Sequence, residues 1–308
     1  MSAQPAAEQI RWGFWRVVAP APTIASSCIV VLVFAGALGP WAEAVWLGWL
    51  AFGLLTLGRA GERWFVQLGW GFRRLGAADR TLLEPVWSDV LDRTGVSGSA
   101  VDLYVQRGSA VNAYAVGGRS VAVSAPLVAA YRSGVLRRAG VAAVLAHEIG
   151  HSQTGGVRCL PLDVWLSLPW RVVYRSVSWI GHRTVGRQPL LPLSVVAGVV
   201  VVTADVELIR TGAWSAAVIL TVLGCSAAIS PVVDAAMSRA DEYAADRFAA
   251  AAGYAPDLAR VLEQIDDGGG RRTLGDAAVA RHPTVQDRIT RLARAAGITT
   301  RRGLRGLA

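Results

Sequence analysis

Long uncharged runs are the most prominent feature of the hydrophobic pattern. No charged residue occurs over residues 19–42, 44–58, 189–204 and 212–233. The first two runs meet at the turn LGPWAE, and the last two are separated by a short segment that holds Asp205, Glu207 and Arg210. Such runs are typical of membrane helices, so the pattern predicts two transmembrane helical hairpins, over residues 19–58 and 189–233.

A cleavable signal peptide is the alternative explanation of the first run. The run lacks a clear cleavage site of small residues, and a second apolar run follows it at once. Both features favour a hairpin over a removable leader.

The polar segments outside the hairpins show the shorter patterns of a soluble domain. Apolar residues recur at helical spacing in DRTLLEPVWSDVLDRTG, which predicts a helix that packs on a sheet. The runs VDLYVQ and NAYAVGGRSVAVS are strand-like, and Gly117 and Gly118 mark a tight hairpin turn in the second. Helices are expected over residues 126–133 and from about residue 135 to 153.

Composition narrows the class of protein. The chain is 53% hydrophobic and 17% charged, with a mean hydropathy of +0.39, which is too apolar for an ordinary soluble domain. Its net charge of +9 comes from arginine alone, in clusters beside apolar runs and without a recognisable nucleic-acid module. We therefore expect a lipid bilayer as the partner and no nucleic acid. Cys28, Cys159 and Cys225 are too scattered to indicate a disulfide framework or a cysteine zinc site.

Arginine placement orients the hairpins. The flanking arginines are Arg11 and Arg16 before the first hairpin, Arg59, Arg63, Arg73 and Arg74 after it, Arg183 and Arg187 before the second, and Arg239 after that. The turn of the first hairpin has no basic residue, and that of the second has Arg210 alone. By the positive-inside rule, everything outside the two hairpins is expected in the cytosol.

The stretch VAAVLAHEIGHSQTGG, residues 141–156, sets His147, Glu148 and His151 at the spacing HExxH. Histidines four apart project from one helix face, near enough to hold one zinc ion, and the glutamate beside the first can reach a water on that ion. Because the chain has only four histidines, chance rarely produces this motif. The alternative, a helix with two surface histidines, fits poorly with the apolar turns that precede the motif.

Such a zinc site needs one more protein ligand. The stretch MSRADEYAADRFAAAAG, residues 237–253, places Glu242 and Asp246 four apart on an alanine-rich helix, where one acid could bind the ion and the other orient a ligand. The alternative is a solvated helix face paired with Arg239 and Arg247. The presence of HExxH elsewhere in the chain favours the metal site.

Together these motifs resemble the HtpX-like integral-membrane zinc metallopeptidases, relatives of the CAAX prenyl endopeptidases. The likeness rests on HEIGH, SRADEYAAD, NAYAVGG, RHPTVQDRI and the two hydrophobic hairpins, and covers most of the chain. It implies that Glu242 is the third zinc ligand and that Asp246 supports a zinc histidine. It also implies that Asn112 and His282 lie near the substrate carbonyl. Arg288 resembles an arginine of the family, which implies a contact with the substrate or transition state, with a surface charge as the alternative.

A shared ion constrains the topology. If His147, His151 and Glu242 meet, the chain between them crosses the membrane an even number of times. We expect residues 160–180 to lie on the membrane surface, because Arg171 and Arg175 share one helix face and three tryptophans suit an interface. The alternative is that this segment crosses and only one later run spans.

The expected fold class is a mainly α membrane protein, with two transmembrane hairpins and a cytosolic α+β zincin-like metalloprotease domain with a small β-sheet. The expected parts are a cytosolic N-terminal segment 1–18, hairpin 19–58, peptidase part 59–157, interfacial segment 158–188, hairpin 189–233, peptidase part 234–296 and a basic tail 297–308.

The expected function is a zinc endopeptidase of the bacterial inner membrane, with one Zn²⁺ per chain and an active site facing the cytoplasm. Glu148 is the expected general base, and damaged or misassembled membrane proteins are the expected substrates, as in protein quality control. The alternatives are a non-catalytic membrane scaffold that keeps a zinc site and a basic nucleic-acid tether. Structural zinc sites are usually closed by four protein ligands, and no cysteine or further histidine is spaced to close this one, which favours catalysis.

Overall fold

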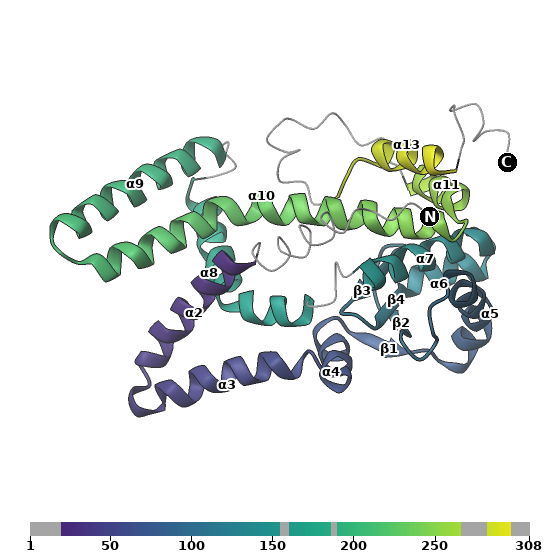
Figure 1. The fold of residues 1–308 in the computed structure, drawn as a ribbon, viewed down its shortest axis with the longest axis horizontal. Coiled ribbons are helices and arrows are strands. Elements are labelled where there is room, and N and C mark those ends of the chain that lie inside the picture. The colour runs from purple at the N-terminus through teal and green to yellow at the C-terminus, as the bar shows by residue number, and fades with distance from the viewer. Residues whose placement is uncertain (1–19, 155–159, 186–189, 266–281, 297–308) are drawn as a thin grey trace. The chain divides into compact units, whose positions relative to one another are not determined.

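The computed structural model divides the chain into two units, each built from two separate chain segments (Figure 1). The described residues are 20–154, 160–185, 190–265 and 282–296. Unit 1 comprises residues 1–54 and 162–234, and unit 2 comprises residues 55–161 and 235–308. The predicted N-terminal segment 1–18 and basic tail 297–308 lie outside the described residues.

Unit 1 is helical wherever it is described. Its elements are α2 (Ala21–Gly36), the short 3₁₀ helix η1 (Gly39–Trp41), α3 (Ala42–Leu55), α8 (Leu160–Val185), α9 (Leu190–Arg210) and the first part of α10 (Trp214–Ala251). Helices thus form over the apolar runs, as the pattern predicts. None of the described helices is by itself long and apolar enough to cross a membrane, and only the pair Gly39–Leu55 and Arg59–Gly69, bent at its break, meets that test together.

Polar side chains link the helices of unit 1. Ser26 Oγ of α2 donates to Ser226 Oγ of α10 at 2.8 Å, and Trp165 Nε1 of α8 donates to the carbonyl of Trp49 in α3 at 2.9 Å. Hydroxyl and indole groups placed between apolar helices need such partners, because an unpaired polar group there is costly. The helices of this unit therefore contact one another through specific hydrogen bonds as well as apolar packing.

The second hairpin differs from its prediction at its turn and at its C-terminal end. Asp205, Glu207 and Arg210 lie inside α9 and not in the turn, which follows at Gly212 with a φ of +77°. Charged residues do not break a helix, whereas a glycine in the left-handed region ends one readily. In addition, α10 continues without a break from the apolar run through the segment that carries Glu242.

Unit 2 is built around a mixed four-stranded sheet of order β1-β2-β4-β3. Its strands are β1 (Phe72–Arg74), β2 (Asp102–Gln106), β3 (Ala113–Val116) and β4 (Ser120–Ser124). The central strand β4 is buried along its whole length, runs parallel to β2 and pairs antiparallel with β3. As predicted, β3 and β4 form a hairpin at Gly117 and Gly118. The strand β3 lies at one edge of this sheet.

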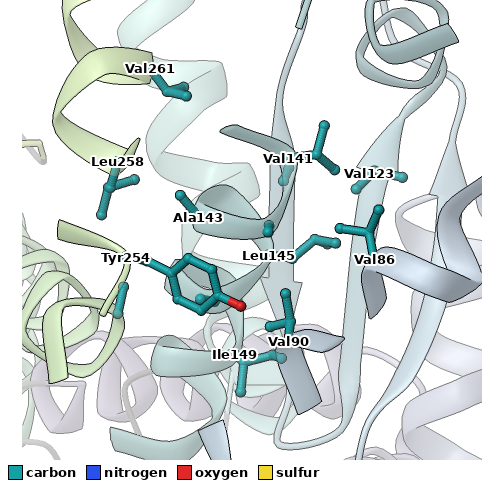
Figure 2. Close-up of a cluster of buried hydrophobic side chains, with 14 of the residues drawn as sticks. Val86, Val90, Val123, Val141, Ala143, Leu145, Ile149, Tyr254, Leu258 and Val261 are labelled. Atoms are coloured by element: carbon teal, nitrogen blue, oxygen red, sulfur yellow. The ribbon is translucent and has the colours of Figure 1, made fainter. Parts of the chain in front are cut away.

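Helices flank the sheet of unit 2. They are α4 (Arg59–Gly69), α5 (Ala77–Thr94), α6 (Ala125–Arg132), α7 (Arg138–Thr154), the second part of α10, α11 (Ala255–Ile265) and α13 (Val285–Ala295). Figure 2 shows the core, where Val86 of α5, Leu145 of α7 and Leu258 of α11 meet. The helix α7 is buried almost throughout, so its position is set by packing on several sides. The prediction of a mainly helical chain with a small sheet is confirmed.

Candidate metal centre

The HExxH motif lies on α7, which brings its two histidines together. The rings of His147 and His151 lie edge to face, with centroids 4.7 Å apart. Gly150, which lies between the two histidines in the sequence, faces α10 so closely that a Cβ atom there would lie 2.9 Å from the Cα of Ala245. The two helices that carry the candidate ligands therefore touch backbone to backbone at the site.

Glu242 of α10 completes a group of three ligand-type residues. Its Oε2 lies 3.5 Å from His147 Nε2, and its Oε1 lies 3.8 Å from His151 Nε2. The three ligand atoms all lie within 4.8 Å of one another. Among the described residues, these three form the group of metal-binding side-chain types that lies close enough together to hold a metal ion.

The donor set fits a zinc ion. Zinc binds imidazole nitrogen and carboxylate oxygen at about 2.0–2.2 Å in a tetrahedron, whose neighbouring ligand atoms are then about 3.4 Å apart. The separations from Glu242 to the two histidines are close to that value. Two imidazoles and one carboxylate also leave one tetrahedral position for a water or a substrate.

Asp246, one turn after Glu242 on α10, holds the other side of His147. Its Oδ1 lies 3.0 Å from His147 Nδ1. Arg288 of α13 in turn donates to both Asp246 oxygens, at 2.7 and 2.9 Å. A carboxylate on Nδ1 fixes the tautomer and the orientation of the ring. As a result, Nε2 of His147 faces Glu242.

The family model described as Peptidase family M48 matches residues 78–296, well over half of the chain. The chain belongs to peptidase family M48. The match begins in α5, ends in α13 and includes every candidate site residue, so the family resemblance stated from the sequence is confirmed. Membership of M48 supports metallopeptidase activity. No curated protein matches the chain.

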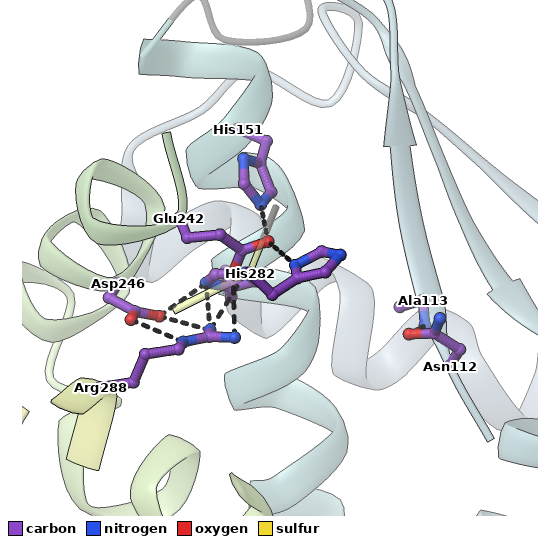
Figure 3. Close-up of polar contacts among 8 residues, drawn as sticks. Asn112, Ala113, His151, Glu242, Asp246, His282 and Arg288 are labelled. Atoms are coloured by element: carbon purple, nitrogen blue, oxygen red, sulfur yellow. Dashed lines mark hydrogen bonds and ion pairs between the residues drawn. The ribbon is translucent and has the colours of Figure 1, made fainter. Parts of the chain in front are cut away.

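Two residues near the C-terminus of the M48 region reach Glu242. His282 Nδ1 lies 3.0 Å from Glu242 Oε1, and Arg288 Nη1 lies 2.9 Å from Glu242 Oε2. The side chain of His282 is 71% exposed, whereas that of Arg288 is 12% exposed. Arg288 is therefore built into the site, and His282 lies at its open side (Figure 3). The stretch 266–281 ahead of His282 lies outside the described residues.

Burial controls the ionisation of Glu148 and His151 in the HExxH motif. Burial raises the pKa of Glu148 to about 7, although His147 and Arg288 act against it. Burial also lowers the pKa of His151 to about 3, together with the charge of His147, so that His151 is neutral at pH 7. A neutral imidazole is the form that binds a metal ion.

The other two ligand-type residues are coupled through hydrogen bonds. Burial acts to raise the pKa of Glu242, but hydrogen bonds with His147 and His282 and the charge of Arg288 hold it well below its usual range. Burial acts to lower the pKa of His147, but hydrogen bonds with Asp246 and Glu242 raise it to about 9. Glu242 is thus an anion, the form in which a carboxylate binds a metal ion, whereas an ion bound at His147 must displace the proton of that ring.

Asn112 lies just before β3 and away from the carboxylate cluster (Figure 3). Its backbone N–H donates to Ser124 Oγ at 3.0 Å, and its side-chain Oδ1 accepts from the N–H of Ala113 at 2.9 Å. The structure thus gives Asn112 the contacts of a residue that caps the start of a strand.

Sequence reasoning missed one neighbour of Glu148 in the HExxH motif, because that neighbour is a backbone group. The backbone N–H of Ala115 in β3 lies near the Glu148 carboxylate and acts to lower its pKa. No side-chain type signals such a donor. The available clue is the strand-like stretch NAYAVGG ahead of the HExxH helix, which favours packing of the two against each other.

Proposed function

We propose that this M48 chain is a zinc-dependent, membrane-bound endopeptidase that cleaves membrane or misfolded proteins at a cytosolic active site. One observation carries the proposal: His147, His151 and Glu242 converge, while the buried Glu148 lies beside them without belonging to the ligand group. Three ligands and a separate acid are the arrangement of a catalytic zinc site, whereas structural sites are usually closed by four protein ligands.

Glu148 is the general base of the proposed mechanism. When bound, zinc supplies Lewis acidity that polarises a scissile carbonyl and makes a water more acidic. Glu148 takes the proton of the attacking water and passes it to the leaving amine. Asp246 and Arg288 hold His147 in its tautomer during these steps.

The edge strand β3 supports an extended mode of substrate binding. The carbonyl of Asn112 accepts from the N–H of Ser124 at 2.9 Å, so Tyr114 and Val116 also face β4 and the backbone groups of Ala113 and Ala115 turn to the other edge. An extended peptide can add there as a further strand, main chain to main chain. Such binding accepts many sequences, which suits an enzyme that removes damaged proteins. The Asn112 amide would donate to the substrate carbonyl as charge develops.

Exposed apolar side chains support the membrane location. Large apolar residues are exposed mainly on unit 1, for example Phe34 (69%), Trp41 (70%) and Val202 (62%). Soluble monomers rarely expose extensive apolar surface, so a lipid environment accounts for these side chains. The arginines after residue 58 favour a cytosolic position for unit 2.

Replacing Glu148 tests the catalytic role. Glu148→Gln is expected to keep the zinc content of the wild type and to abolish peptide cleavage, because the amide cannot accept the proton of the water. Metal analysis of the purified full chain in detergent, beside a peptide cleavage assay, gives both readings. Glu263→Gln, at an exposed position of α11, is the matched control and should cleave normally. Turnover by Glu148→Gln would refute the mechanism.

A further inference from the structure

Glu62 of α4 is a buried acid that the mechanism does not use. Its side chain is 4% exposed. The carboxylate accepts from the N–H of Gly118 at 3.2 Å, from the N–H of Arg119 at 3.0 Å and from Ser120 Oγ at 2.8 Å. All three donors belong to the turn between β3 and β4 or to the first residue of β4. One carboxylate therefore binds the whole turn.

The turn is shaped around this carboxylate. Gly117 has a φ of +69°, which is favourable for glycine. A Cβ atom at Gly117 would lie 2.4 Å from the carboxyl carbon of Glu62. Glycine is thus required here both by the backbone conformation and by the close approach of Glu62. The next residue, Gly118, is also a glycine and supplies one of the N–H donors.

The helix that carries Glu62 is itself fixed to the sheet. Arg63, the next residue, binds Asp102 at the start of β2 through two nitrogens, at 2.9 and 3.0 Å. One turn along, Val66 is fully buried against Phe72, Tyr104 and Val116. Because α4 is held at these points, its carboxylate is a rigid anchor and not a mobile surface acid.

The anchored turn leads directly to the proposed active site. The strand β3 is only four residues long and has one described neighbour in the sheet, β4. It packs against α7, the helix that carries Glu148. A short edge strand is fixed by its two ends, which here are the turn on Glu62 and the contact between Asn112 and Ser124. Releasing the turn would free β3 beside the general base.

We propose that Glu62 is a positioning residue: by binding the β3–β4 turn it sets the placement of β3, and through β3 the orientation of Glu148 and the edge that receives the substrate. This inference rests on the proposed peptidase function. It assigns a positioning role in activity to the helix that follows the first apolar hairpin.

Two substitutions in the full chain test the proposal. Glu62→Ala removes every acceptor, whereas Glu62→Gln keeps the shape but turns an NH₂ group toward one of the N–H donors. Glu84→Gln is the matched control, because Glu84 is an exposed acid of α5 whose side chain is 66% exposed. The measurements are zinc content, hydrogen–deuterium exchange of residues 112–124, and kcat and KM per zinc-loaded molecule, well below the melting temperature.

Both Glu62 variants are expected to keep zinc and to lose exchange protection locally over residues 112–124. Misplacement of reacting groups by about 1 Å costs about 100-fold in rate, so kcat per zinc-loaded Glu62→Ala molecule should fall by up to about that factor, with Glu62→Gln between it and the wild type. KM should rise as well, because the substrate edge is displaced. Glu84→Gln should match the wild type in all three measurements.

Two results would overturn the role of Glu62. One is unchanged exchange with unchanged kcat and KM. The other is a lower melting temperature, with protection lost throughout unit 2 and kcat per folded molecule unchanged, which would make Glu62 purely structural. Failure of the proposed function is distinguishable from both, because zinc-loaded wild type would then cleave no peptide at all.

Discussion

At the scale of single residues, Glu242 and Asp246 show how two acids four apart on one helix receive different tasks. Glu242 faces Nε2 of both histidines, whereas Asp246 faces Nδ1 of His147. Arg288 contacts both acids and so neutralises charge that would otherwise accumulate between them. We expect only the acid on the Nε2 side to be a metal ligand.

Alanine substitutions separate the two tasks. Glu242→Ala removes one of three protein bonds to the ion and should lose zinc. Asp246→Ala should keep most of its zinc and lose activity by about 10- to 100-fold, as is usual for residues that orient a ligand. Metal analysis and a cleavage assay on the purified proteins make the comparison, with Asp257→Ala of α11 as the control. Full zinc retention by Glu242→Ala would place the third ligand elsewhere.

The two histidines of the metal group were predictable from sequence, because the spacing of His147 and His151 admits one geometry on a helix. Periodicity alone left the choice between Glu242 and Asp246 open, and the family resemblance indicated Glu242. Glu62 was not predictable, because its partners are mainly backbone N–H groups more than fifty positions away. Its signal was faint: a single acid among the arginines of residues 59–74.

At the scale of secondary-structure elements, the crossing of α7 and α10 determines whether the ligands can meet. Gly150 permits the crossing, because any side chain there would meet the backbone of Ala245 and the Cβ atom of Phe248. Ala245 lies between Glu242 and Asp246 on α10. Small displacements of this contact therefore move the acids relative to the histidines.

Gly150→Ala is expected to separate the two helices and to reduce zinc affinity and activity together, because backbone atoms cannot yield as a flexible side chain can. Gly140→Ala on the same helix is the matched control. Its added methyl group would meet only side-chain atoms of Val261 and Leu136, and alanine favours the helix by about 1 kcal/mol. Zinc titration of both variants gives the comparison. Equal zinc affinities would show that α7 and α10 can move apart at this contact without weakening zinc binding.

The pattern of charged residues was a poor guide to where helices end. The second hairpin was predicted to end at residue 233 and the next peptidase part to begin at residue 234, yet α10 runs through this boundary from Trp214 to Ala251. A change from apolar to charged residues marks a change of surroundings, and alanine-rich sequence remains helical across it. The strand pairs and the turn at Gly117 were easier to predict, because glycine conformation is a local property.

At the scale of the whole molecule, the chain passes between its two units three times. His151 comes before residues 162–234 of unit 1, and Glu242 comes after them. If unit 1 lies in a bilayer, this middle segment must begin and end on the same side, because both ligands belong to one site. Whether α8 lies on the membrane or crosses it stays a prediction.

Single cysteines test this topology. In a chain without Cys28, Cys159 and Cys225, Ser133→Cys and Ala251→Cys should both be labelled from the cytoplasmic side. Leu38→Cys and Thr211→Cys, in the two predicted hairpin turns, should be labelled from the other side. All four positions are exposed. Labelling of positions 133 and 251 on opposite faces would exclude a shared ion.

The discontinuity of unit 2 also has a consequence for biosynthesis. A ribosome that adds about 5–20 residues per second completes the HExxH helix several seconds before Glu242 is made. Asp246, His282 and Arg288 follow later still, and the metal group needs α10 in place. A nascent chain therefore carries the general base and two histidines but no complete ligand set. The proposed peptidase gains its activity only once nearly all of it has been synthesised, which keeps it harmless to neighbouring chains during its own insertion.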